Sequence, residues 1–127
     1  MSTVNPVEIL AFVRAQLDED ERKVAAMERE AERARTAPIF QSYPPNWLAG
    51  VDIFVSPKRW QAEVDAKRRI LAEHPTEGPS KYVPIQYCGT CQGGDGIPTG
   101  PAPCSTVRLL ALPYADREGY REEWRPT

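Results

Sequence analysis

The chain's only histidine and all three of its cysteines fall within one window of the sequence. They are His74, Cys88, Cys91 and Cys104, in the spacing His-x13-Cys-x2-Cys-x12-Cys. One imidazole and three thiolates make the complete ligand set of a tetrahedral zinc site. We therefore predict a Zn²⁺ site at these residues, and any fold of this chain has to bring the four side chains together.

Four protein ligands leave no open coordination position, so the predicted zinc is structural and we predict no catalytic residues. We expect that the protein is not an enzyme. Two other interpretations of the cysteines stay open: a redox pair of the thioredoxin type at Cys88 and Cys91, or free thiols. A redox pair is normally followed by a helix, whereas residues 92–96 read Gln-Gly-Gly-Asp-Gly. The histidine alone would be an ordinary packing or surface residue.

The size of the chain limits its core. With 127 residues, 13 of them proline and 8 glycine, we expect one small, mainly α-helical domain with at most one or two short strands. A small core gains from a stabilising metal. The N-terminus has no basic stretch followed by an apolar one, and no apolar run is long enough to span a bilayer, so we expect a cytoplasmic protein that does not bind membranes.

The pattern predicts three helices over residues 1–127. Asn5 and Pro6 start a long helix over 6–35, and Ser56 and Pro57 start a second over 57–74, before Pro75. A Pro-rich irregular insert occupies 36–56, with a short strand over 51–55. A zinc-binding loop covers 75–104, and a short helix followed by an aromatic tail covers 105–127, capped by Ser105 or Thr106.

One apolar stripe runs along the first predicted helix. Its members are Leu10, Val13, Leu17, Val24, Met27, Ala31 and Ala34. The stripe must be covered, either by the rest of this small domain or by a second copy of the chain. Residues 18–21, Asp-Glu-Asp-Glu, point around most of the helix and are interpreted as a solvated face, with a divalent-cation site as the weaker alternative.

Residues 104–126, 12–21 and 66–74 resemble a family of small actinobacterial and actinophage proteins grouped as a domain of unknown function. The first of these segments reads CSTVRLLALPYADREGYREEWRP. In that family a helix-end histidine and cysteines placed like those of this chain recur, which agrees with the ligand set inferred above. The resemblance implies a phage or actinobacterial origin, and the host cytoplasm as location if phage-encoded. It breaks between residues 36 and 57, and it implies no activity.

Two functions remain as hypotheses. The first is a zinc-stabilised interaction or accessory module that binds a protein, or itself, through the first helix or the tail. That tail alternates Tyr114, Tyr120 and Trp124 with arginines, which is typical of an interface anchor, but it can equally pack on the helices. The second is a nucleic-acid-associated zinc protein that uses the second helix and the zinc loop. Basic residues 67–69 favour it, while the acidic neighbours and net charge of −2 do not.

Overall fold

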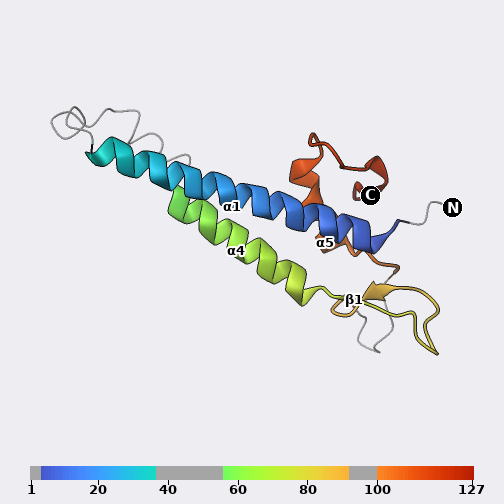
Figure 1. The fold of residues 1–127 in the computed structure, drawn as a ribbon. Coiled ribbons are helices and arrows are strands. Elements are labelled where there is room, and N and C mark those ends of the chain that lie inside the picture. Colours follow the sequence, from blue (N-terminus) through green and yellow to red (C-terminus); the bar gives the residue numbers. More distant parts are fainter. Residues whose placement is uncertain (1–3, 37–55, 92–99) are drawn as a thin grey trace. The chain divides into compact units, whose positions relative to one another are not determined.

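The computed structural model describes residues 4–36, 56–91 and 100–127 (Figure 1). Its elements in chain order are α1 (Pro6–Thr36), α4 (Pro57–Glu73), β1 (Thr76–Glu77), β2 (Tyr87–Cys88) and α5 (Ser105–Ala111), followed by the 3₁₀ turns η1 (Leu112–Tyr114) and η2 (Glu122–Trp124). The predicted mainly α-helical fold, with three helices and at most one or two short strands, is confirmed for these residues, although β1 and β2 lie in the segment predicted as an irregular loop. The predicted insert over 36–56, with its strand over 51–55, lies almost wholly outside the described residues.

The chain divides into two compact units. Unit 1 comprises Met1–Gln16 and Lys67–Thr127, and unit 2 comprises Leu17–Ala66. Both α1 and α4 contribute residues to each unit. Among the described residues, no helix combines the length and apolar composition needed to cross a membrane.

Helix α1 begins where the sequence predicts. The Asn5 side chain accepts a hydrogen bond from the Val7 amide at 2.9 Å, which satisfies one of the free donors of the first turn. The buried stripe differs in detail from the predicted one, since Leu10 is only half-buried while Ile9 and Phe12 are buried together with Val13, Leu17 and Val24. The predicted residues Val13, Leu17 and Val24 are buried, and only the first turns differ, because Pro6, Ile9 and Val13 align at steps of three and four.

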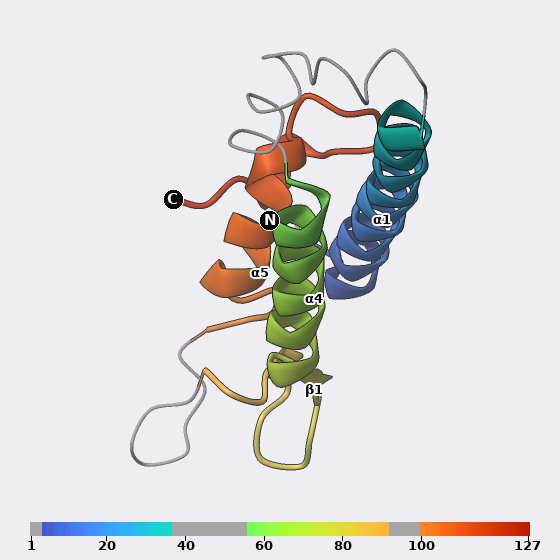
Figure 2. The same cartoon turned by 90° about the vertical axis from the view of Figure 1, so that its left-hand side faces the viewer.

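Within unit 2, the second half of α1 and the first half of α4 lie side by side and run in opposite directions (Figures 1 and 2). Gln61 on α4 donates a hydrogen bond to Glu21 on α1 at 3.2 Å. One prediction for this region is wrong: Asp20, expected on a solvated face, is only 4% exposed. Four consecutive helical residues point around the whole circumference, so one of them falls on the buried stripe.

Helix α4 begins at Pro57, as predicted, and ends at Glu73, one residue before the predicted end. The Ser56 hydroxyl accepts from the Arg59 amide at 3.4 Å, and the Ser56 carbonyl accepts from the Trp60 amide at 2.9 Å. Pro75 cannot continue a helix, and it disfavours helical backbone at the residue before it. His74 is therefore the first residue after the helix, with its amide bonded to the Leu71 carbonyl at 3.1 Å.

Strands β1 and β2 form an antiparallel pair in which Thr76 faces Cys88 and Glu77 faces Tyr87. The connecting loop turns back on itself at Ser80, whose amide donates to the Val83 carbonyl at 2.7 Å. Gly78 starts this loop in the left-handed region, at a φ of 77°. A Cβ at this position would lie 2.7 Å from the Ile85 carbonyl oxygen and from the Tyr87 ring, so the loop requires glycine here.

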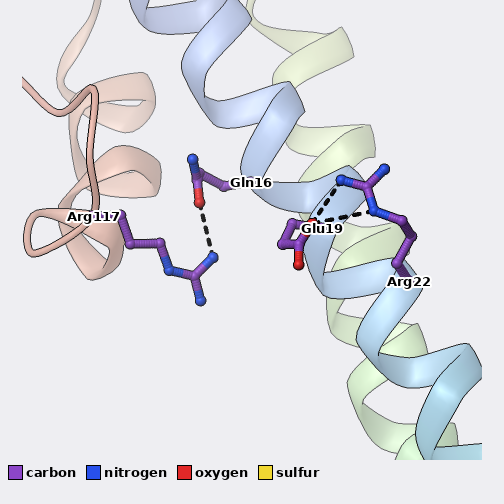
Figure 3. Close-up of polar contacts among 4 residues, drawn as sticks. All are labelled: Gln16, Glu19, Arg22 and Arg117. Carbon is purple, nitrogen blue, oxygen red and sulfur yellow. Dashed lines mark hydrogen bonds and ion pairs between the residues drawn. The ribbon is translucent and has the colours of Figure 1, made fainter.

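The C-terminal segment packs on the start of α1 within unit 1 (Figure 1). Trp124 is 2% exposed, and its ring centroid lies 5.2 Å from that of Phe12 and 5.5 Å from that of Tyr120. Figure 3 shows Arg117 donating to the Gln16 side chain, at 2.8 Å, and separately the ion pair of Arg22 with Glu19 on α1. Tyr114 is also buried. Of the two interpretations of the tail, an interface anchor or packing on the helices, the structure therefore confirms packing for Tyr114 and Trp124.

Helix α5 starts differently from the prediction. Its N-cap residue is Cys104 itself, with extended backbone and no side-chain capping hydrogen bond, rather than Ser105 or Thr106. Its buried residues are Val107 and Ala111, whereas Leu109 is 54% exposed. Because its seven residues make only two turns, only a narrow face of α5 is buried.

Candidate metal centre

The side chains of His74, Cys88, Cys91 and Cys104 meet in unit 1. One ligand atom from each lies within 4.8 Å of the other three. The imidazole Nδ1 lies 3.4 Å from Cys88 Sγ, 3.5 Å from Cys91 Sγ and 3.7 Å from Cys104 Sγ. The four side chains predicted as metal ligands are therefore close enough to hold one ion.

The three nitrogen–sulfur distances match a metal shell better than hydrogen bonds. A neutral imidazole nitrogen carries one proton or one lone pair, so it cannot make three hydrogen bonds at once. A tetrahedral zinc, with Zn–N of about 2.0–2.1 Å and Zn–S of about 2.3 Å, holds its nitrogen about 3.5–3.6 Å from each sulfur. The observed 3.4, 3.5 and 3.7 Å bracket that value.

The end of α4 and the β-pair place the first two ligands. His74 lies two residues before Thr76, which faces Cys88 across the sheet, so the ladder brings the imidazole and the thiol together. The Gly89 amide donates to the Pro75 carbonyl at 2.8 Å, and the Thr90 hydroxyl donates to the Glu73 carbonyl. Two hydrogen bonds thus connect the Cys-x2-Cys turn to the end of α4.

The last ligand reaches the centre through the segment before α5. The Ala102 amide donates to the Gln86 carbonyl at 2.9 Å, which places the following residues beside β2. The Arg108 guanidinium then donates to the Pro103 carbonyl at 3.2 Å and to the Glu123 carbonyl at 2.9 Å. This side chain connects the backbone next to Cys104 with the turn that carries Trp124, a role that the sequence did not reveal.

The cysteine sulfurs experience different electrostatic surroundings. Burial raises the pKa of the Cys88 thiol, but hydrogen bonds from the backbone amides of Cys91 and Thr90, with His74, bring it down from 9.0 to about 7. Burial and the adjacent sulfurs of Cys88 and Cys104 raise the pKa of Cys91 to about 12. A bound cation lowers the pKa of Cys91 again, because it favours the deprotonated form of every ligand.

The basic residues predicted as a possible nucleic-acid surface are partly paired on α4. Arg59 lies 3.5 Å from Glu63 and Arg69 lies 3.2 Å from Glu73, both as exposed i,i+4 pairs. The Lys67 ammonium lies 5.7 Å from the centroid of the Tyr114 ring. Paired cations present a smaller net field to a phosphate backbone.

A profile of a family of unknown function (DUF6221) matches residues 6–126, so the chain belongs to this family. This membership bears out the resemblance to a domain-of-unknown-function family. No curated protein and no solved structure matches the chain.

Proposed function

We propose that this chain, as a member of the DUF6221 family, is a small zinc protein in which the metal is structural and the surface around it binds another protein. The observation that carries the proposal is the cluster of four ligand atoms within 4.8 Å. Three sulfurs and one imidazole nitrogen suit a borderline-soft ion that accepts tetrahedral geometry, which favours Zn²⁺ over Mg²⁺ or Ca²⁺.

A structural role follows from the number and origin of the ligands. All four coordination positions would be filled by protein, so no position is left for an activated water. The ligands come from the end of α4, from β2, from the turn after it and from the cap of α5. The two-residue strands cannot hold these segments together alone, since isolated two-stranded pairs are marginally stable. The ion would stabilise the contacts around them.

The distribution of exposed apolar side chains supports protein binding near this centre. In the described part of the chain, the large apolar residues that are exposed all belong to unit 1: Val7, Tyr82, Ile85 and Leu109. Tyr82 is 86% exposed and lies between two metal ligands, His74 and Cys88. A loop held at both ends loses little conformational freedom on binding, and tyrosine is enriched at interface hot spots.

Metal analysis of the purified protein tests the zinc proposal. About one zinc per chain should survive dialysis, and Cys88→Ser or His74→Ala should lower both the metal content and the melting temperature. The exposed Thr127→Ala is the matched control and should change neither. Metal-free protein that melts as the zinc-treated protein does would overturn the proposal.

Affinity purification from a lysate, with and without nuclease, tests the second half. A protein partner should be retained after nuclease treatment and lost in the Tyr82→Ala variant, whereas Glu118→Ala, at an exposed polar position, should retain it. Loss of every bound species on nuclease treatment would favour the nucleic-acid hypothesis instead. A zinc-loaded protein that retains no partner under any condition would contradict the interaction role.

A further inference from the structure

A hollow of about 370 Å³ opens onto the sulfur side of the candidate centre. It is lined by all three cysteines and, among others, by Ser105, Arg108 and Arg125, but not by His74. A single ion and its ligand shell need far less space than this volume, which is large enough for several water molecules. Small solutes can therefore reach the sulfurs, although the coordination positions are all occupied by protein atoms.

The three sulfurs are not equally accessible from the hollow. Cys88 is 5% exposed, belongs to the β-ladder opposite Thr76, and its sulfur accepts hydrogen bonds from two backbone amides. Cys91 and Cys104 are both half-buried, one in the turn after β2 and the other at the cap of α5. The sulfur of Cys91 contacts the sulfur of Cys104 as well as that of Cys88.

We propose that Cys91 and Cys104 form a modification site for peroxides, at which oxidation to a disulfide releases the zinc. This inference rests on the proposed zinc site. One zinc-bound thiolate attacks a peroxide oxygen, which breaks the O–O bond and gives a sulfenic acid and water. The second thiolate attacks the sulfenic sulfur, forming the S–S bond and expelling the oxygen as water. For hydrogen peroxide, two thiolates bound to one Zn²⁺, one peroxide and two protons give one disulfide, two waters and free Zn²⁺.

The closeness of the two sulfurs favours this pairing. They lie within 4.8 Å of each other, and a disulfide brings them to about 2.05 Å. After oxidation only Cys88 and His74 remain as ligands, and two ligands do not retain a structural zinc ion. The hydrogen bonds that hold Cys88 in place make it the poorer partner.

The test uses the zinc-loaded, fully reduced chain treated with hydrogen peroxide, with released zinc measured by a chromogenic chelator. One zinc should appear per disulfide formed, and a thiol reductant with added zinc should restore the starting state. All three cysteines share one tryptic peptide, between Lys81 and Arg108, so differential alkylation and fragmentation are needed to assign the pair. The expected result is a disulfide between Cys91 and Cys104 with Cys88 alkylated as a free thiol.

A matched pair of variants tests the route to the sulfurs. Ser105→Phe places a ring in the lining of the hollow and should slow zinc release several-fold at unchanged zinc content, whereas Glu118→Phe, at an exposed position outside it, should not. A disulfide that includes Cys88, or zinc retained through peroxide treatment, would overturn the modification site alone. A chain that never binds zinc would overturn it together with the proposed function, so the two failures are distinguishable.

Discussion

Replacing Trp124 by alanine tests whether the C-terminal segment is part of the core. The indole is 2% exposed and packs against the rings of Phe12 and Tyr120, which also contact each other. Truncating a buried aromatic residue to alanine costs about 3–5 kcal/mol, part of which is the loss of aromatic pairs at about 0.5–1.5 kcal/mol each. We expect Trp124→Ala to lower the free energy of unfolding by about 4 kcal/mol.

This loss is large for so small a protein. About 1 kcal/mol moves the Tm of a 60–100-residue domain by roughly 4–8 °C, so the melting temperature should fall by more than about 10 °C. Guanidinium unfolding followed by far-UV circular dichroism is the appropriate assay, because the substitution removes a fluorophore. Zinc and a reductant must be kept at fixed concentrations, since any ligand of the folded state adds to the apparent stability.

Two further variants make the measurement decisive. Trp124→Phe keeps a ring in contact with Phe12 and Tyr120, and Nε1 of Trp124 has no hydrogen-bond partner among the described residues, so this variant should lose less stability than Trp124→Ala. Leu109→Ala, at a position that is 54% exposed, should change stability by less than about 0.5 kcal/mol. If Trp124→Ala were as stable as Leu109→Ala, the tail would not be packed and the reasoning would be refuted.

Three other predictions concern the metal centre and its supports. Because the Cys88 thiol has a pKa of about 7 and is protonated below it, zinc must displace its proton at low pH. Calorimetry in buffers of different ionisation enthalpy measures the protons released when zinc binds. The contribution of this thiol should fall by about 0.8 proton per zinc from pH 6 to pH 8, and zinc should bind more weakly at pH 6. A proton release that does not change with pH would contradict this prediction. Gly78→Ala should cost about 1–3 kcal/mol in denaturant unfolding, since Gly78 has a φ of 77° and no room for a Cβ, while Gly100→Ala, with nothing within 4 Å, should be neutral. Equal losses would show that the loop tolerates a side chain. Arg108→Ala should lower the free energy of unfolding by about 1–3 kcal/mol, because it leaves the Pro103 and Glu123 carbonyls without their donor. Arg69→Ala removes only the exposed ion pair with Glu73 and should lower it by less than about 0.5 kcal/mol. Thermal melts of both variants would check this, and similar values would assign no structural role to Arg108.

Local chemistry explains why the helix starts and ends were predictable. Asn5 and Ser56 each precede a proline and accept a hydrogen bond from an amide of the first turn, as capping residues do. Pro75 excludes a further helical turn, so the end of α4 was predictable to within one residue from the residue type alone. The four candidate ligands were predictable for a similar reason, since they are the only histidine and the only cysteines in the chain.

Features that depend on tertiary packing were not predictable. Asp20 is buried although its neighbours form an acidic run, because the helix phase decides which residue faces the core. That Nδ1 rather than Nε2 of His74 faces the three sulfurs depends on the angle at which the chain leaves α4. The contacts of Arg108 with two backbone carbonyls carry no sequence signal, because any arginine can make them.

X-ray absorption at the zinc edge, combined with elemental analysis of the same sample, identifies the metal and the atoms bound to it. We expect one zinc per chain, bound by one nitrogen at about 2.0–2.1 Å and three sulfurs at about 2.3 Å. His74→Ala should change the nitrogen contribution, and Cys104→Ser should reduce the number of sulfurs. A protein that holds no zinc, or fewer than three sulfurs around the metal in the unaltered chain, would contradict the proposed zinc site.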